Sequence, residues 1–305
     1  PKYGVTAFCP TSVACAPDRL QMLLAAVASA QQSSSTGARI IGAHLESNFI
    51  NAEWKGAQPQ TCLRVPFTTD GRDFSAADIM RVIRDNRAAI AIVTIAPELA
   101  NGLELVRELV SLGIRVSIGH SGATYEQASA AIAAGARHAT HLFNRMSSLT
   151  ARAPGVVGAV LESPLVTAEL ICDGVHVHPA LVSTAIRTKS VDRIVAITDG
   201  TAAAGLPVGS RAKLGDHTIM AGERTALLDD GTLAGSILTM DGAFRMLVGL
   251  GYALPEASRL CATTAAGAIG VADTGAIAVG KRADLVVMSR DLRVKQTYIG
   301  GRLIS

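Results

Sequence analysis

The chain has 305 residues, of which 49% are hydrophobic and 17% charged, and its formal net charge is +3. This length and apolar content allow a large buried core and exclude an intrinsically disordered chain. The small, dispersed charge and the 4% aromatic content argue against a nucleic-acid partner, and no apolar stretch approaches the roughly 18 residues of a membrane span.

Short β-rich runs alternate with Ala- and Leu-rich helical stretches over about the first 200 residues. The runs are continuously apolar, which is typical of parallel strands covered by helices on both faces of a sheet. Seven strands are expected, over Val5–Thr11, Ala38–Glu46, Ala89–Ala96, Arg115–His120, His138–Asn144, Thr167–Cys172 and Ile194–Asp199. The expected helices include Asp18–Gln31, Ser75–Asp85, Glu98–Leu112 and Tyr125–Ala134, with Asp18 and Ser75 as N-caps.

Seven strand–helix units in series predict an α/β fold, a (β/α)8 barrel of the TIM type that lacks one unit. The chain opens at Pro1 without a methionine and soon enters a strand. The first barrel strand is therefore the one expected to be missing.

The pattern changes after Asp199. Antiparallel strands are expected over Lys213–Ala226 and Thr232–Ala234, with an Asp-Asp-Gly turn before the second. Two helices should follow, over Ile237–Leu250 and Ala257–Gly267, and the chain should end in strands over Gly275–Met288, Val294–Ile299 and Arg302–Ile304. We expect a barrel domain of residues 1–210 and 236–272, and a small β-sandwich-like accessory domain of residues 211–235 and 273–305.

Polar side chains lie at the ends of four predicted strands, namely Glu46, His120, His141 and Asp199. The carboxyl ends of parallel strands meet at one face of a barrel, where such folds build their active sites. A carboxylate and two imidazoles, with water as the fourth ligand, suit a catalytic divalent metal. Each residue alone could be a satisfied core group, as we expect for His44 on the other strand face. Their joint placement favours an enzyme.

Asp199 precedes a run of small residues, Gly-Thr-Ala-Ala-Ala-Gly. A carboxylate beside activated water can take a proton and then deliver it to a leaving amine. The alternative interpretation is an ordinary Asp-Gly turn.

A series of motifs occurs in one order along essentially the whole chain. It comprises His44-Leu45-Glu46, Lys55-Gly56-Ala57, Gly119-His120-Ser121-Gly122, His141-Leu142-Phe143-Asn144, Asp173-Gly174-Val175-His176, Ile197-Thr198-Asp199 and Gly231-Thr232-Leu233-Ala234-Gly235-Ser236. The series resembles the N-acetylglucosamine-6-phosphate deacetylase family of the amidohydrolase superfamily. The resemblance implies a metal-dependent hydrolase of amino sugar metabolism, which converts N-acetylglucosamine-6-phosphate to glucosamine-6-phosphate and acetate.

The same resemblance implies a role for each matching residue. Glu46, His120 and His141 would bind one divalent metal ion, and Zn²⁺ is expected in preference to Fe²⁺ or Mn²⁺. Asp199 would act as the general base and the general acid. A homodimer is also implied, because a neighbouring subunit often completes the phosphate site in this family. The sugar phosphate would be held by Asn144, Arg145, Arg152 and His176. An Arg can fork onto a phosphate, although Arg152 by itself is typical of an ordinary solvated arginine.

The sequence departs from the family pattern in three places. Ser47-Asn48 replace a Gly-Pro pair, and Gln58 stands where the family has a His that polarises the acetyl carbonyl. A Gln amide can donate a hydrogen bond to that carbonyl or its oxyanion, so we expect Gln58 to contact substrate and take part in catalysis. The His-x-His of the first barrel strand is absent, which predicts a single metal.

Other functions remain open on the sequence. The chain could act on another N-acyl sugar such as N-acetylgalactosamine-6-phosphate, on an N-acyl amino acid or on a cyclic amide, or it could be a non-catalytic barrel that binds a sugar phosphate. The complete set of Glu46, His120, His141 and Asp199 argues against the last, because a binding protein needs no water-activating group. Five widely spaced cysteines without a CxxC pair predict reduced, buried thiols and a cytoplasmic location.

Overall fold

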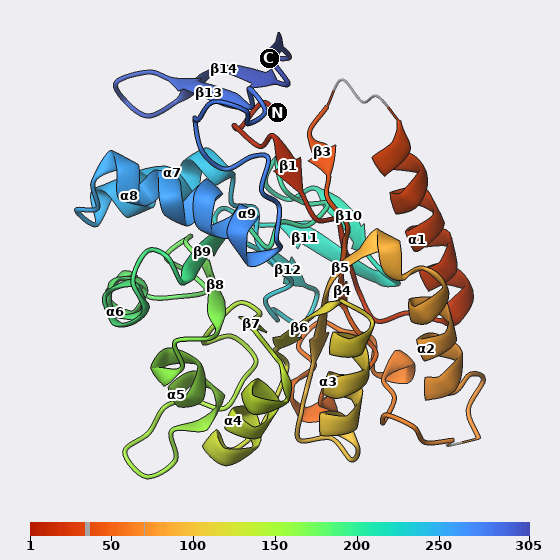
Figure 1. The fold of residues 1–305 in the computed structure, drawn as a ribbon. Helices are drawn as coiled ribbons and strands as arrows, with labels where there is room; N and C mark the ends of the chain where they lie inside the picture. The colour runs from red at the N-terminus through yellow and green to blue at the C-terminus, as the bar shows by residue number, and fades with distance from the viewer. Residues whose placement is uncertain (34–36, 70) are drawn as a thin grey trace. The chain divides into compact units, whose positions relative to one another are not determined.

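A computed structural model describes residues 1–33, 37–69 and 71–305 (Figure 1). The contacts within the chain group it into two compact units. The first unit comprises Pro1–Phe8, the described part of Ser34–Arg39, and Thr167–Ser305; the second comprises Cys9–Ser33 and Ile40–Val166. This grouping divides the chain inside the predicted barrel, so it does not test the predicted boundary between barrel and accessory domain.

The second unit contains five parallel strands that pair in chain order. They are β2 (Thr11–Ser12), β4 (Ala43–Glu46), β5 (Ile90–Ile95), β6 (Arg115–Ile118) and β7 (His138–Ala139). Their side chains are almost all buried, which explains the continuous apolar runs in the sequence. β7 ends earlier than predicted, because the backbone turns left-handed at His141 and again at Phe143.

Helices cover this group of strands. α3 packs on β5 and β6 and also contacts α4, which in turn packs on α5 (Figure 1). The helices of the second unit are α1 (Pro17–Gln32), α2 (Ala76–Asp85), α3 (Gly102–Ser111), α4 (Tyr125–Ala134) and α5 (Gly155–Glu162). Three short 3₁₀ turns accompany them, at Ala52–Trp54, Gln60–Cys62 and Arg87–Ala89.

The predicted helix starts are partly confirmed. Ser75 caps α2 in a capping box with Asp78, as its position before the apolar run predicted. Asp18 as a cap is wrong, because Ala16 occupies that position and Pro17, with its fixed φ, is the first residue of α1. α3 begins at Gly102 rather than at Glu98, which leaves Glu98 in the loop that follows β5.

In the first unit, β8 (Thr167–Ile171) and β9 (Ile194–Ile197) pair in parallel. β9 is contacted by α6 (Pro179–Lys189), α7 (Met240–Gly249) and α9 (Thr264–Ala268). The predicted helix Ala257–Gly267 is interrupted: α8 (Leu254–Ser258) passes through one π-helical turn, Arg259–Thr263, into α9.

Two antiparallel sheets of three strands each also belong to the first unit. One contains β10 (Arg211–Leu214), β11 (His217–Ala221) and β12 (Ala226–Leu228), and the other contains β13 (Leu285–Met288), β14 (Val294–Ile299) and β15 (Arg302–Leu303). The predicted strand Thr232–Ala234 is wrong, since only an isolated bridge joins Leu233 to Leu227. β1 (Ala7–Phe8) and β3 (Arg39–Ile40) form a separate two-stranded sheet. β1 lies within the first predicted strand, Val5–Thr11, and β3 lies within the second, Ala38–Glu46.

Two sequence predictions concern the chain as a whole. In the described residues, no helix combines the length and the hydrophobicity that a bilayer-spanning segment requires. None of the five cysteines forms a disulfide, but only Cys172 is buried and the other four are half-buried, so the prediction of buried thiols holds for Cys172 alone.

Candidate metal centre

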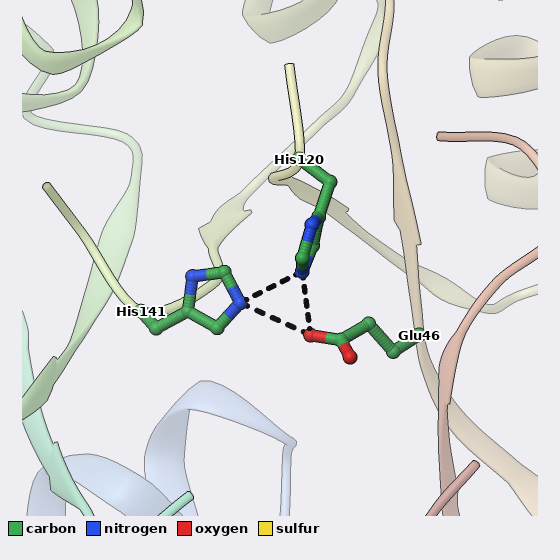
Figure 2. Close-up of side chains that lie close together, drawn as sticks. All are labelled: Glu46, His120 and His141. Carbon is green, nitrogen blue, oxygen red and sulfur yellow. Dashed lines mark hydrogen bonds and ion pairs between the residues drawn. The ribbon is translucent and has the colours of Figure 1, made fainter. Parts of the chain in front are cut away.

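The second unit brings together three of the predicted strand-end residues. Glu46 is the last residue of β4, and His120 and His141 each lie two residues beyond the ends of β6 and β7. Figure 2 shows the three side chains pointing toward one another. Both imidazoles are almost fully buried, with 6% of each side chain exposed, and the Glu46 side chain is 14% exposed.

The three donor atoms form a tight triangle. Nε2 of His120 and Nε2 of His141 each lie 3.0 Å from Oε1 of Glu46 and 3.0 Å from each other. Donors placed about 2.1 Å from a tetrahedral ion lie about 3.4 Å apart, so a small opening of this triangle would accommodate one. Two imidazole nitrogens and a carboxylate oxygen are a ligand set that suits Zn²⁺ and similar divalent ions. The residues present therefore fit a divalent metal ion.

The tautomer of His120 follows from its second contact. Its Nδ1 lies 2.8 Å from the main-chain oxygen of Trp54, which can only accept, so Nδ1 must carry the proton. When a metal ion takes the place of the second ring proton, this tautomer presents the Nε2 lone pair to the ion. A backbone carbonyl behind a metal-binding imidazole is the usual arrangement for fixing the tautomer and the ring orientation.

The charge of the cluster favours an ionised Glu46. Burial by itself would raise the pKa of this carboxyl, but the charge and hydrogen bond of His120, together with those of His141, hold the pKa well below its ordinary value. The group is therefore a carboxylate at neutral pH, as a metal ligand must be.

An unusual backbone conformation recurs at three of the four predicted strand-end residues. His120 has φ +49°, His141 has φ +31° and Asp199 has φ +48°, and each lies two residues past its strand. A left-handed conformation costs a non-glycine residue about 1–2 kcal/mol, and such outliers cluster at functional sites. His120, His141 and Asp199 thus share a left-handed backbone at the point where their strands have ended.

A glycine makes room beside the first of these turns. A Cβ on Gly119 would lie 2.8 Å from Cβ of Thr140 and 2.9 Å from Cγ2 of Thr94. These two threonines are buried and hydrogen-bond to each other, and Ser117 and His44 join them through Thr140 and Thr94. His44 is therefore the hydrogen-bonded core group that the sequence predicted.

We expect Gly119→Ala to destabilise the protein by about 1–3 kcal/mol, because the added methyl group overpacks this rigid layer. Gly249→Ala is the matched control: Gly249 lies in α7 with open space around its Cα, so alanine should stabilise by at most about 1 kcal/mol. Urea unfolding of the metal-free proteins measures both. Equal stability of the two variants would contradict the packing argument.

The residues that depart from the family pattern are built into the fold near Glu46. Gln58 is buried; its Oε1 accepts from the main-chain N–H of Ala14 at 2.8 Å, and its Nε2 donates to Oε2 of Glu46. Ser47 donates to the main-chain oxygen of Thr94 at 2.6 Å. Asn48 donates to the main-chain oxygens of Cys15 and Cys62 at 2.8 and 2.7 Å, so Ser47 and Asn48 fix this loop through side-chain hydrogen bonds.

The remaining predicted site residues lie in different settings. Asn144 donates weakly to the main-chain oxygen of His141 at 3.3 Å, Arg145 is exposed and its side chain packs over Gly56, and Arg152 is exposed. These residues belong to the second unit, as does the triangle. His176 and Asp199 belong to the first unit, so the structure does not relate them to the triangle.

Asp173 and His176 form a dyad in the loop after β8. Oδ2 of Asp173 lies 2.6 Å from Nδ1 of His176, and Oδ1 accepts from the main-chain N–H groups of Val175 and His176 at 2.8 and 2.9 Å. Burial opposes ionisation, but these hydrogen bonds and the charge of His176 hold the pKa of Asp173 below its ordinary value of 3.8. The ionised Asp173 therefore stabilises the folded state at pH values above the ordinary pKa of 3.8.

We expect Asp173→Asn to cost about 1.5–3 kcal/mol at neutral pH, the range for hydrogen bonds to a charged group. Because a carboxyl whose pKa is lowered on folding loses its contribution as the pH falls through that pKa, the gap between variant and wild type should narrow below about pH 4. Urea unfolding of the metal-free proteins between pH 7 and pH 3 measures the gap. A gap that stays constant down to pH 3 would contradict the assignment.

The sequence analysis missed a group of polar residues behind His120. Glu98 accepts hydrogen bonds from Asn51, Ser121 and Gly122, and Trp54 accepts one from His120. The signal was available for Glu98, because this residue lies shortly past the end of β5, as His120 and His141 lie past the ends of β6 and β7. Glu98 was placed at the start of the predicted helix Glu98–Leu112, and for that reason it was not identified as a strand-end residue.

A parallel β/α fold with a Glu-His-His cluster at its strand ends defines the class of TIM-type (β/α)8 barrel enzymes with a divalent-metal site. The model of the amidohydrolase family matches residues 2–304. The chain belongs to the amidohydrolase family.

Individual relatives are similar over almost the whole chain. The N-acetylglucosamine-6-phosphate deacetylase of Vibrio furnissii is 35% identical, over 99% of this chain and 73% of the relative. The N-acetylgalactosamine-6-phosphate deacetylase of Escherichia coli O157:H7 is 36% identical, over 100% of this chain and 78% of the relative. Among solved structures, a mutant N-acetyl-D-glucosamine-6-phosphate deacetylase of Mycobacterium smegmatis, in complex with N-acetyl-D-glucosamine-6-phosphate, matches with a TM-score of 0.90 and 33% identity, over 99% of this chain and 77% of that chain.

Proposed function

We propose that this chain hydrolyses the acetamide of N-acetylglucosamine-6-phosphate to glucosamine-6-phosphate and acetate, a step in amino sugar catabolism. The observation that carries the proposal is the triangle of Glu46, His120 and His141, whose side chains face one another at the ends of β4, β6 and β7 of one parallel sheet. Relatives that share the amidohydrolase family and about a third of the sequence carry this activity in their names.

One divalent ion, Zn²⁺ in preference to Fe²⁺ or Mn²⁺, would be held by Glu46, His120 and His141. When bound, it supplies Lewis acidity, which acidifies water and polarises the amide carbonyl. Asp199 accepts a proton from the attacking water and returns it to the amide nitrogen, so that the amine leaves in neutral form. The left-handed backbone at Asp199, shared with both histidine ligands, supports this role.

Gln58 would donate a hydrogen bond to the substrate carbonyl and to the oxyanion that forms from it. Its orientation supports this role: Oε1 is taken by the N–H of Ala14, so the Nε2 group, which has two hydrogens, faces Glu46. One Nε2 hydrogen can keep its hydrogen bond to Glu46 while the other donates to the substrate carbonyl. Such a preorganised donor stabilises negative charge without reorganisation.

The phosphate would be bound by cationic and amide groups. His176, oriented by Asp173, would present its Nε2 edge, and Asn144, Arg145 and Arg152 would supply further donors. Arg152 is exposed, which is compatible with a phosphate site completed across a homodimer. We also propose a cytoplasmic location, supported by five cysteines that form no disulfide. We further propose a division into a barrel of residues 1–210 and 236–272 and an accessory domain of residues 211–235 and 273–305.

Acetate release from N-acetylglucosamine-6-phosphate tests the proposal directly. The protein is treated with a chelator and then assayed with added Zn²⁺, Fe²⁺ or Mn²⁺, with N-acetylglucosamine as the unphosphorylated control. Metal-dependent release that is much faster for the phosphorylated sugar supports the proposal. No release with any metal from a folded protein would reject it.

The galactosamine epimer is the second candidate substrate. The similarity to an N-acetylgalactosamine-6-phosphate deacetylase is as high as that to the glucosamine enzymes. The ratio of kcat/KM for the two epimeric sugar phosphates decides between them.

A further inference from the structure

We propose that Glu98 is a positioning residue that holds His120 in its metal-binding geometry. The inference rests on the proposed function, in which His120 is a metal ligand. Glu98 lies in the loop after β5, and its carboxylate accepts hydrogen bonds from Asn51, Ser121 and Gly122, which are not members of the triangle. Its effect on the metal would therefore pass through the residues around His120.

The carboxylate of Glu98 joins two segments of the chain. Oε1 accepts from Nδ2 of Asn51 at 2.9 Å and from the main-chain N–H of Gly122 at 2.6 Å. Oε2 accepts from the hydroxyl of Ser121 at 2.7 Å. Ser121 and Gly122 directly follow His120, so one carboxylate fixes the chain immediately behind the ligand to the segment that begins at Asn51.

The segment that begins at Asn51 in turn hydrogen-bonds to both the main chain and the ring of His120. The main-chain N–H of Asn51 donates to the main-chain oxygen of His120 at 3.0 Å. Oδ1 of Asn51 accepts from the N–H of Glu53 at 2.9 Å and caps the 3₁₀ turn that ends at Trp54. The main-chain oxygen of Trp54 then accepts from Nδ1 of His120 at 2.8 Å. Glu98 thus stabilises the segment that sets both the backbone and the ring of the ligand.

His120 needs such support because its backbone is left-handed, with φ +49°. A strained residue of this kind persists only where its surroundings over-determine it. On one side the main chain of Ser121 pairs with Arg145 and Ser147, at 3.1 and 3.0 Å. On the other side Glu98 restrains Ser121 and Gly122 through hydrogen bonds. Gly122 also lets the Trp54 side chain lie close to the main chain, since a Cβ at Gly122 would lie 2.5 Å from Nε1 of Trp54.

The first test measures Zn²⁺ affinity of the metal-free full chain by competition with a chromophoric chelator. Glu98→Ala should weaken binding by about 10–100-fold, the usual effect of losing a residue that orients a metal ligand. Glu98→Gln should stay within a few-fold of wild type, because its amide oxygen can accept from Asn51 and Gly122 and its NH₂ group can donate to the Ser121 hydroxyl. Glu104→Ala, on an exposed position of α3, is the control and should change nothing.

A double-mutant cycle separates positioning of His120 from a general loss of structure. In a His120→Asn background, Glu98→Ala should have little further effect on Zn²⁺ affinity, because the ligand it positions is gone. An equal fold-loss in both backgrounds, or no loss in the wild-type background, would overturn the inference.

Two outcomes need separate readings. If Glu98→Ala does not fold, Asn51→Ala, which removes the same link from the other side, takes its place, and unchanged Zn²⁺ affinity in that variant overturns the inference. If the folded wild-type chain binds none of Zn²⁺, Fe²⁺ and Mn²⁺, the proposed function fails as well. If it binds Zn²⁺ and Glu98→Ala binds equally, only the inference fails.

Discussion

Asp199→Asn should lower kcat by about 10²–10⁴-fold, the usual contribution of a general acid–base residue, while metal content stays at the wild-type level. The substitution keeps the size of the side chain, and asparagine tolerates the left-handed backbone at this position as well as aspartate does. What it removes is the ability to accept and return a proton. Steady-state acetate release and metal analysis of the purified variant measure the two quantities.

The control for this variant is Asp229→Asn, whose side chain is 72% exposed in the turn after β12. It should leave both kcat and metal content unchanged. If Asp199→Asn keeps most of its activity, Asp199 is not the proton-transfer group. If it loses its metal, the residue has a ligand role that the present assignment lacks.

His141→Asn should weaken Zn²⁺ binding by more than about 100-fold, because even a residue that only orients a ligand contributes about 10–100-fold. Asparagine again preserves the left-handed backbone, so the loss reports on the imidazole and not on strain. Activity should fall with metal occupancy and recover only partly at high Zn²⁺. Chelator competition and acetate release measured across a range of Zn²⁺ concentrations test both expectations.

His217→Ala, in β11 of the first unit, is the matched histidine control and should bind Zn²⁺ as the wild type does. Wild-type affinity in His141→Asn would exclude His141 from the ligand set. The remaining pair, Glu46 and His120, would then need another partner, which the triangle does not provide.

The sequence predicted the three donors because each follows a continuous apolar run, and the carboxyl ends of parallel strands converge. It could not predict how the backbone turns at those ends. β7 ends at Ala139 and β6 at Ile118, earlier than the apolar pattern indicated, because the left-handed residues His120 and His141 terminate the pairing. Histidine is enriched among the non-glycine residues that adopt a positive φ, but this preference is too weak to place a turn at a given residue.

The supporting residues escaped prediction for a different reason. Glu98 accepts from a main-chain N–H and from two side chains that are distant in sequence, and such long-range partners leave no periodic signal. Helical spacing of the apolar residues that follow it made Glu98 read as the start of a helix. The roles of Ser47 and Asn48 were hidden in the same way, since their partners are main-chain oxygens of Thr94, Cys15 and Cys62.

The left-handed backbone at His120, His141 and Asp199 has a consequence for engineering this protein. Glycine at any of these positions would relieve about 1–2 kcal/mol of backbone strain, but at the buried His120 and His141 it would also leave a cavity and remove the imidazole. Relief of backbone strain at these turns is therefore gained only by discarding the chemistry. Improvement of this chain as a biocatalyst should begin from positions remote from these turns, with turnover selected together with stability.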